Sequence, residues 1–160
     1  MVLSYLFLTL SCAQPVPVKI TKLTSGYGTR IWIDGARQFH DGIDLQAPKG
    51  TPIKTIIAGE VIFSGVGPEG GNTVVIRELT SRINKITVLY GHLHTIAVKK
   101  GQNVSLNDII ATVGSTGNAT APHLHLSVWV DNLAKKKFKN VEPNKHFKFC
   151  KYKIRKNRHF

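Results

Sequence analysis

Short apolar runs separated by Gly, Pro and Asn occupy the chain between Leu23 and Pro143. The runs are rich in β-branched residues and only about five to eight residues long, a pattern that favours strands. No segment keeps an apolar period of three to four residues over the length of a helix. The clearest runs are residues 53–58, 59–63, 73–76, 83–90, 109–113 and 123–130. We therefore expect an all-β domain of antiparallel sheet, arranged as a sandwich or a barrel-like fold.

Clusters of turn-forming residues divide these runs. Gly and Pro at 65–68, Gly and Asn at 70–72 and the pair at 117–118 predict turns between strands. A chain of 160 residues is long enough for one domain with its own core. We assign the segments as follows: 1–13 export signal, 14–24 extended lead-in, 25–143 domain, and 144–160 basic tail.

The N-terminus has the pattern of an export signal. Residues 2–10 form an apolar run of suitable length for a signal peptide, too short to span a bilayer. Small residues around Cys12 allow cleavage after Ala13 or lipid modification of Cys12 as an anchor. A buried terminal strand or helix is the third interpretation. We expect an exported protein, located in the periplasm, in the cell wall or at the outer membrane as a lipoprotein.

Positive charge is concentrated at the C-terminus. Residues 135–160 contain 11 of the 22 Lys and Arg residues, with Glu142 as the single acid. Such a segment attracts polyanions, among them anionic envelope polymers, lipid head groups and nucleic acid. Aromatic residues do not alternate regularly with the basic ones, so we expect no specific nucleic-acid binding. A solvated tail without a dedicated partner is an equally good interpretation. Cys12 and Cys150 do not form a disulfide framework.

Histidine is the residue type that points to chemistry. Five of the seven histidines fall in three short clusters, around His40, His92 and His123. If the third cluster is a strand, His123, His125 and Ser127 share one face because side chains alternate. Leucines and valines then occupy the opposite face and form part of the core.

The first cluster adds a carboxylate to these imidazoles. In an extended segment His40, Gly42 and Asp44 lie on one face, and Gly42 leaves space for close approach. Two histidines and one carboxylate suit a catalytic Zn²⁺ site, which uses three protein ligands and leaves a position for water. The remaining histidines are available for proton transfer.

These segments together resemble the lysostaphin/LytM family of zinc endopeptidases, which has the duplicated hybrid motif fold. The resemblance covers residues from about 25 to 143, in matching order and spacing. It rests on these stretches: 25–30 (SGYGTR), 39–53 (FHDGIDLQAPKGTPI), 58–62 (AGEVI), 71–76 (GNTVVI), 90–93 (YGHL), 98–102 (VKKGQ), 114–117 (GSTG) and 122–125 (PHLH). The resemblance implies a zinc-dependent endopeptidase that hydrolyses peptide crosslinks of bacterial peptidoglycan, either glycyl-glycine bridges or D-alanyl–diaminopimelate bonds.

The same resemblance implies roles for individual residues. His40, Asp44 and His125 match the zinc ligands, and His92 and His123 match catalytic histidines that do not bind the metal. His94 has no counterpart in the family and is expected at the surface. His146 and His159 belong to the basic tail and receive no role.

Three other functions are weighed against this one. A non-catalytic LytM-like regulator of other wall hydrolases keeps the fold, but every catalytic position is present here. A biotinyl or lipoyl carrier or a phosphotransfer domain shares the phrase at 98–102, but no lysine lies in the setting that carrier chemistry needs. A nucleic-acid-binding protein is suggested only by the net charge of +13.

Overall fold

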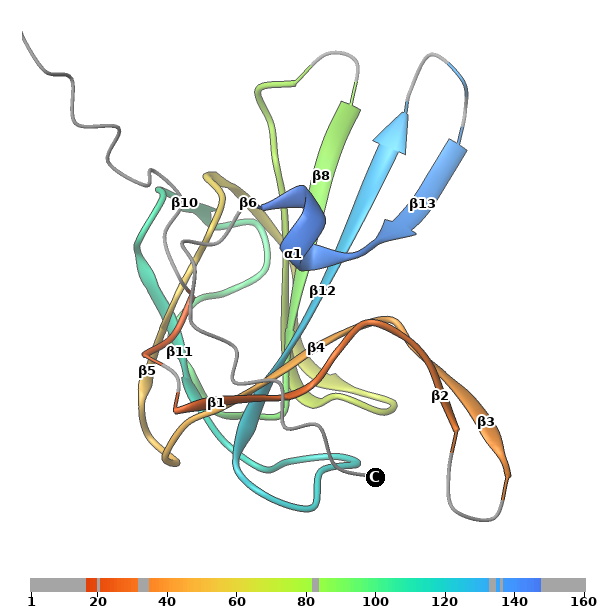
Figure 1. Cartoon of the computed structure of the whole chain (residues 1–160). Coiled ribbons are helices and arrows are strands. Elements are labelled where there is room, and N and C mark those ends of the chain that lie inside the picture. Colours follow the sequence, from red (N-terminus) through yellow and green to blue (C-terminus); the bar gives the residue numbers. More distant parts are fainter. Residues whose placement is uncertain are drawn as a thin grey trace, which may run out of the picture.

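The computed structural model describes residues 17–19, 21–31, 35–81, 84–132, 135 and 137–147. Nearly all regular structure in these residues is antiparallel β-sheet, as the apolar pattern predicts (Figure 1). The elements are β1 (Lys22–Ser25), β2 (Gly28–Ile31), β3 (Arg37–His40), β4 (Gly42–Gln46), β5 (Pro52–Lys54), β6 (Gly59–Gly67), β7 (Gly71–Arg77), β8 (Asn84–Gly91), β9 (Leu93–Ile96), β10 (Asn103–Val104), β11 (Ile109–Val113), β12 (His123–Asn132), β13 (Lys137–Val141) and α1 (Pro143–His146).

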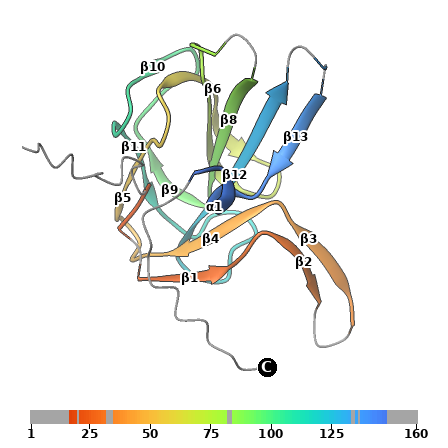
Figure 2. The same ribbon diagram turned by 45° about the horizontal axis from the view of Figure 1, so that its top comes forward.

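One large sheet carries most of the strands. Its order is β1-β4-β12-β8-β7-β6-β10, and β13 pairs with the far half of β12. A smaller sheet, β5-β11-β9, packs beside it, and β2 and β3 form a separate hairpin. Figures 1 and 2 show this hairpin projecting away from the two packed sheets. Strand β12 lies centrally, because β4 and β8 both pair with it.

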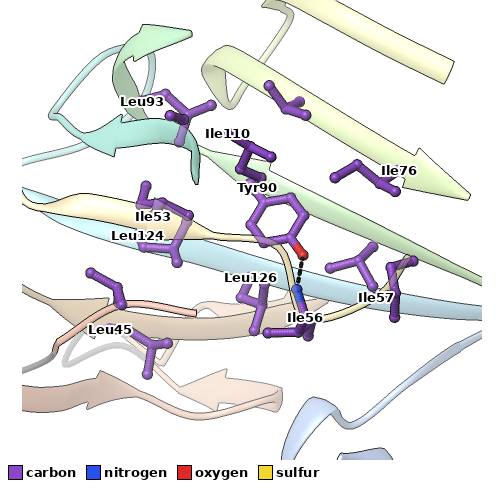
Figure 3. Packing of buried hydrophobic residues seen from close by; sticks show 14 of the residues in the cluster. Leu45, Ile53, Ile56, Ile57, Ile76, Tyr90, Leu93, Ile110, Leu124 and Leu126 are labelled. Atoms are coloured by element: carbon purple, nitrogen blue, oxygen red, sulfur yellow. Dashed lines mark hydrogen bonds between the residues drawn. The ribbon is translucent and has the colours of Figure 1, made fainter. Parts of the chain in front are cut away.

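The core lies between the large and the small sheet (Figure 3). On β12, Leu124, Leu126 and Val128 are fully buried, in agreement with the predicted alternation. Tyr90 on β8 is also fully buried, and its hydroxyl accepts a hydrogen bond from the backbone N–H of Ile56 at 3.0 Å. The dashed line in Figure 3 marks this bond, which satisfies a polar group that burial would otherwise leave without a partner.

Two expected boundaries differ in the structure. The turn predicted at 65–68 is wrong, because β6 continues to Gly67 and the turn occupies 68–70. Gly65 and Gly67 keep their places opposite Thr73 and Gly71 in the β6–β7 ladder. The apolar run at 53–58 is a strand only to Lys54, after which Ile56 and Ile57 are buried without strand pairing. In this run apolar composition therefore indicates burial but not the end of the strand.

Structure extends beyond the segment that carries the motifs. Val18 is buried and bridges Ile53, and β1 pairs with β4 at the edge of the large sheet. At the other end, Phe147 follows α1 and joins the core. The expected signal at 1–13, Cys12, Cys150 and most of the basic tail lie outside the described residues. Among the residues that are described, no helix is both long and apolar enough to cross a bilayer.

Candidate active site

Three strands bring the predicted metal-binding residues together. His40 ends β3, Asp44 lies on β4 and His125 lies on β12. Asp44 and His125 are direct neighbours in the β4–β12 ladder, so their side chains project from the same face of the sheet. The pairing unites residues that are 81 positions apart in the chain.

The three polar atoms of this group are almost equally spaced. Nε2 of His40 lies 3.1 Å from Nδ1 of His125. Oδ1 of Asp44 lies 3.2 Å from Nε2 of His40 and 3.0 Å from Nδ1 of His125. Among the described residues, these three offer ligand atoms that all lie within 4.8 Å of one another, close enough to hold one metal ion. We call these three residues the His–Asp–His trio.

Hydrogen bonds on the far side of each ring decide which nitrogen faces the trio. Nδ1 of His40 donates to the carbonyl oxygen of Gly26 at 2.7 Å, which leaves Nε2 unprotonated when the ring is neutral. Nε2 of His125 lies 2.8 Å from the hydroxyl of Ser127 and 3.2 Å from Oδ1 of Asp41. In the neutral ring with its proton on this nitrogen, the lone pair of His125 is on Nδ1, inside the trio.

Asp44 is held by a guanidinium as well as by the two imidazoles. Nη2 of Arg30, on β2, donates to Oδ2 of Asp44 at 3.0 Å. The bond uses the carboxylate oxygen that faces away from the two histidines, so Oδ1 remains inside the trio. The β2–β3 hairpin thus supplies both Arg30 and His40 to the site.

Two further histidines flank the trio. The ring centroid of His92 lies 4.6 Å from that of His123 and 5.8 Å from that of His125. Nδ1 of His92 donates to the carbonyl oxygen of Thr116, and Nδ1 of His123 donates to that of Ala121, both at 2.8 Å. In the neutral form of each ring the lone pair is therefore on Nε2, and Nε2 of His123 lies 3.6 Å from Oδ1 of Asp44.

The backbone at His92 has an unusual conformation. Its φ is 60°, a left-handed value that is costly for a non-glycine residue. The residue lies between β8 and β9 and is almost completely buried. Its backbone N–H donates to the carbonyl oxygen of Gly70, which helps to hold this conformation. The strain occurs where the imidazole turns toward His123.

Close packing of β4 against β12 requires a glycine. A Cβ at Gly42 would lie 2.5 Å from the carbonyl oxygen of Leu126 and 2.8 Å from Cε1 of His125. The predicted reason for this glycine, space for a close approach, is the one observed. A larger residue would force β4 and β12 apart or displace the ring of His125.

The charges of the site shift its protonation equilibria. Burial by itself would raise the pKa of Asp44, but hydrogen bonds from His125 and His40 hold it far below its usual range. Burial would lower the pKa of His125, yet hydrogen bonds to Asp41 and Asp44 raise it to about 9. Burial also lowers the pKa of His92, which is therefore neutral at pH 7. The trio strongly favours positive charge, and the flanking imidazole is a neutral base.

The sequence pattern predicts no role for Arg30 or Asp41, although both contact the trio. Arg30 enters the resemblance only as part of the stretch 25–30. In a continuous strand Asp41 would point away from His40 and Asp44. The structure interrupts the strand at Asp41, between the end of β3 and the start of β4, and alternation fails there. A second acid directly beside a predicted ligand was the available signal.

Of the remaining histidines, the two that the structure describes do not join the site. His94 lies on β9 with an exposed side chain, in keeping with the expected surface position. His146 is in α1, and His159 lies outside the described residues.

Comparison with known families gives an assignment for this arrangement. The model of peptidase family M23 matches residues 38–140, which include the whole trio and both flanking histidines. The chain belongs to peptidase family M23.

Among curated M23-like relatives, the DD-carboxypeptidase/endopeptidase Mpg of Neisseria meningitidis is 38% identical over 110 residues, which cover 68% of this chain and 24% of that protein. The peptidoglycan DD-endopeptidase ShyA of Vibrio cholerae is 41% identical over 91 residues, 57% of this chain and 20% of that protein. The chain thus spans about a quarter or less of these relatives.

Solved structures share the M23 fold. The catalytic domain of lysostaphin from Staphylococcus simulans superposes with a TM-score of 0.65 and 32% identity, covering 79% of this chain and 92% of that one. A zinc-containing peptidase from Vibrio cholerae gives a TM-score of 0.62 and 35% identity, covering 74% of this chain and 35% of that one. The expected resemblance to lysostaphin-like peptidases and the all-β fold class are therefore confirmed.

Proposed function

We propose that this M23 chain is a zinc-dependent endopeptidase that hydrolyses peptide crosslinks of bacterial peptidoglycan. The observation that carries the proposal is the His–Asp–His trio with two imidazoles beside it. His40, Asp44 and His125 would hold the metal. His92 and His123 would handle protons without binding it.

The donor set fits a zinc ion. Tetrahedral zinc with bonds of about 2.0–2.1 Å needs donor atoms roughly 3.3 Å apart. The three separations of 3.0, 3.1 and 3.2 Å are close to this value. Two neutral imidazoles and one carboxylate are also ligands of the right chemical type. When bound, zinc supplies Lewis acidity and lowers the pKa of a water molecule toward about 7.

The flanking histidines supply the acid–base function. Peptide hydrolysis breaks the C–N bond, adds the hydroxyl of water to the carbonyl carbon and delivers a proton to the leaving amine. Nε2 carries the lone pair of each neutral ring, His92 and His123, because Nδ1 donates to a backbone carbonyl. A neutral imidazole at His92 can accept a proton, and a protonated one can donate to a developing oxyanion. The pair thus covers both needs of the reaction.

Relatives support a peptidoglycan substrate. ShyA carries the name of a peptidoglycan DD-endopeptidase, and Mpg that of a DD-carboxypeptidase/endopeptidase. These names favour crosslinks between D-amino acid centres, such as D-alanyl–diaminopimelate, over glycyl-glycine bridges. We therefore take the D-alanyl–diaminopimelate crosslink as the preferred bond.

Digestion of purified sacculi tests this function directly. Zinc-loaded protein is incubated with crosslinked sacculi, and the released muropeptides are separated and identified by mass. We expect crosslinked dimers to fall and monomers to rise, with one water added for each bond cut. Asp44→Ala protein is the matched control. Zinc-loaded protein that leaves every crosslink intact would refute the proposal.

The alternative is a non-catalytic regulator of other wall hydrolases. Its support is a relative named as cell division protein DipM, from Caulobacter vibrioides, which is 30% identical over 145 residues covering 83% of this chain and 23% of that protein. Incubation with purified crosslinked muropeptides separates the two functions, because a regulator alone leaves them uncut. Stimulation of a second hydrolase without cleavage would favour the regulator.

Export and envelope binding complete the proposal. The apolar run at 2–10 supports export, and Cys12 supports a lipid anchor. The basic tail would bind anionic envelope polymers by charge attraction, which salt screens. Deletion of 148–160 tests this while keeping Phe147, which is part of the core. We expect weaker sacculus binding at low salt and unchanged cleavage of small soluble substrates; unchanged binding would remove the tail's role.

A further inference from the structure

We infer that Asp41 is a positioning residue. Its carboxylate orients Nδ1 of His125 toward the metal, and its negative charge strengthens the bond between His125 and the metal. The inference rests on zinc binding by the His–Asp–His trio, proposed above. Asp41 belongs to neither the trio nor the flanking pair. It meets the site from outside, through the ring nitrogen of His125 that points away from Asp44.

The contact forms a small polar cluster behind His125. Oδ1 of Asp41 lies 3.2 Å from Nε2 of His125, and the Ser127 hydroxyl lies 2.8 Å from the same nitrogen. An ionised carboxylate can only accept a proton, so the contact with Asp41 favours the tautomer of neutral His125 that carries its proton on Nε2. Neutral His125 then has its lone pair on Nδ1, the atom that faces Asp44 and His40. The cluster selects one tautomer of the ring.

The backbone of Asp41 is fixed by a different strand. Nδ2 of Asn140, on β13, donates to the carbonyl oxygen of Asp41 at 2.9 Å and to that of Val128 at 3.1 Å. Asp41 is therefore tied to β12 although it lies between strands. The side chain is half exposed, at 47%, so its substitution does not open a cavity in the core.

Charge gives Asp41 an effect that Ser127 cannot supply. A carboxylate that accepts a hydrogen bond from a ligating imidazole makes that imidazole a stronger donor to the metal. Arg30 acts in the opposite direction, because its guanidinium withdraws negative charge from Asp44. The opposite charges of Arg30 and Asp41 offset each other. The net charge of the site therefore stays near the sum of the metal ion and the Asp44 carboxylate.

Substitutions separate orientation from charge. Asp41→Asn keeps an oxygen that can accept from His125 but loses the charge, whereas Asp41→Ala loses both. Zinc affinity is measured by competition with a chromophoric chelator at fixed pH. From the usual effect of such outer partners, we expect about tenfold weaker binding for Asn and up to about 100-fold for Ala. Asp131→Asn removes the same charge from β12, and we expect no change.

A second measurement compares the unsubstituted protein with Asp41→Asn. In zinc-loaded protein labelled with ¹⁵N at histidine, we expect the proton of His125 on Nε2, with a resonance that shifts in Asp41→Asn. A role in folding alone would lower the melting temperature of the metal-free protein without moving this resonance. Circular dichroism of the metal-free variants checks that they remain folded.

The outcomes distinguish this inference from the proposed function. Equal zinc affinity for Asp41→Asn, Asp41→Ala and Asp131→Asn would overturn it, as would a proton on Nδ1 of His125. A wild-type protein that binds no zinc would overturn both. Zinc-bound protein without sacculus cleavage would refute the peptidase alone, and the affinity ratios would still decide the role of Asp41.

Discussion

The two faces of strand β12 have opposite compositions and opposite tasks. Leu124 and Leu126 point into the core and are fully buried, whereas His123 and His125 point to the other side and meet Asp44 and His92. Each histidine is therefore flanked in sequence by a residue that anchors the strand. A rigid, apolar face fixes the backbone, and the opposite face can carry polar groups at defined distances. Stability and chemistry are divided by alternation within one strand.

Removal of a proposed metal ligand is the strongest test of the separation between the core face and the polar face of β12. Asp44→Ala or His125→Ala should abolish hydrolysis and zinc retention, because the remaining donors are too few for a catalytic zinc site. Metal content by atomic emission and muropeptide release measure the two effects. Asp131→Ala, on the same face of β12, should behave as the wild type. Full activity in a zinc-free ligand variant would show that the trio is not the metal site.

Removal of a flanking imidazole should have the next largest effect. His92→Asn should keep zinc and lower the rate of hydrolysis by ~10²–10⁴-fold, the usual contribution of positioned acid–base groups. Asparagine tolerates the left-handed backbone at this position better than most residues, so the fold is preserved. His94→Asn is the control, since His94 is exposed. Loss of zinc from His92→Asn would instead make His92 a ligand.

A core substitution should give the reverse result. Ile76 on β7 is fully buried, so Ile76→Ala should lower the free energy of unfolding by about 2–5 kcal/mol. Val75→Ala, the next residue, faces the other side and should cost about 1 kcal/mol or less. Denaturant unfolding measures both. Hydrolysis per folded molecule should stay unchanged, and a large rate loss in Ile76→Ala would mean that the two faces are coupled.

The smallest effect concerns Tyr90, the buried polar group of the core face. Tyr90→Phe leaves the N–H of Ile56 without its partner and should cost about 1–3 kcal/mol at pH 7. Burial raises the pKa of Tyr90 to about 12 from 10.0, so its contribution is complete below pH 10 and lost as pH rises toward 12. The difference in unfolding free energy between the wild type and Tyr90→Phe should therefore shrink above pH 10. A constant difference up to pH 12 would contradict the raised pKa.

Sequence alone predicted the fold class and the residues that meet at the site, for identifiable reasons. Alternation at 123–128 is a local property, and β12 shows it without interruption. The pattern His40-x-x-x-Asp44 is weak by itself, but together with the family resemblance it predicts two metal ligands. Both residues lie beside His125 in the structure. The assignment of these residues as ligands remains a prediction, to be tested by the substitutions above.

Features that depend on a break in regular structure could not be predicted in this way. Asp41 reaches His125 only because β3 ends and β4 begins on either side of it. The left-handed backbone of His92 and the carbonyl of Thr116 that receives its Nδ1 come from long-range packing. Arg30 reaches Asp44 from a hairpin whose direction no local pattern specifies. Alternation predicts which side chains of β12 are buried, and tertiary contacts decide where the polar side chains of the site point.

The central place of β12 has a consequence for the order of events during synthesis. His40 and His125 are separated by 85 positions, and β12 must enter between β4 and β8 before they meet. A nascent chain that has emerged only as far as β11 therefore has His40 and Asp44 but no third donor. The three donors can surround one ion only after β12 has docked. The topology therefore delays assembly of the His–Asp–His trio until β12 has been synthesised and has docked.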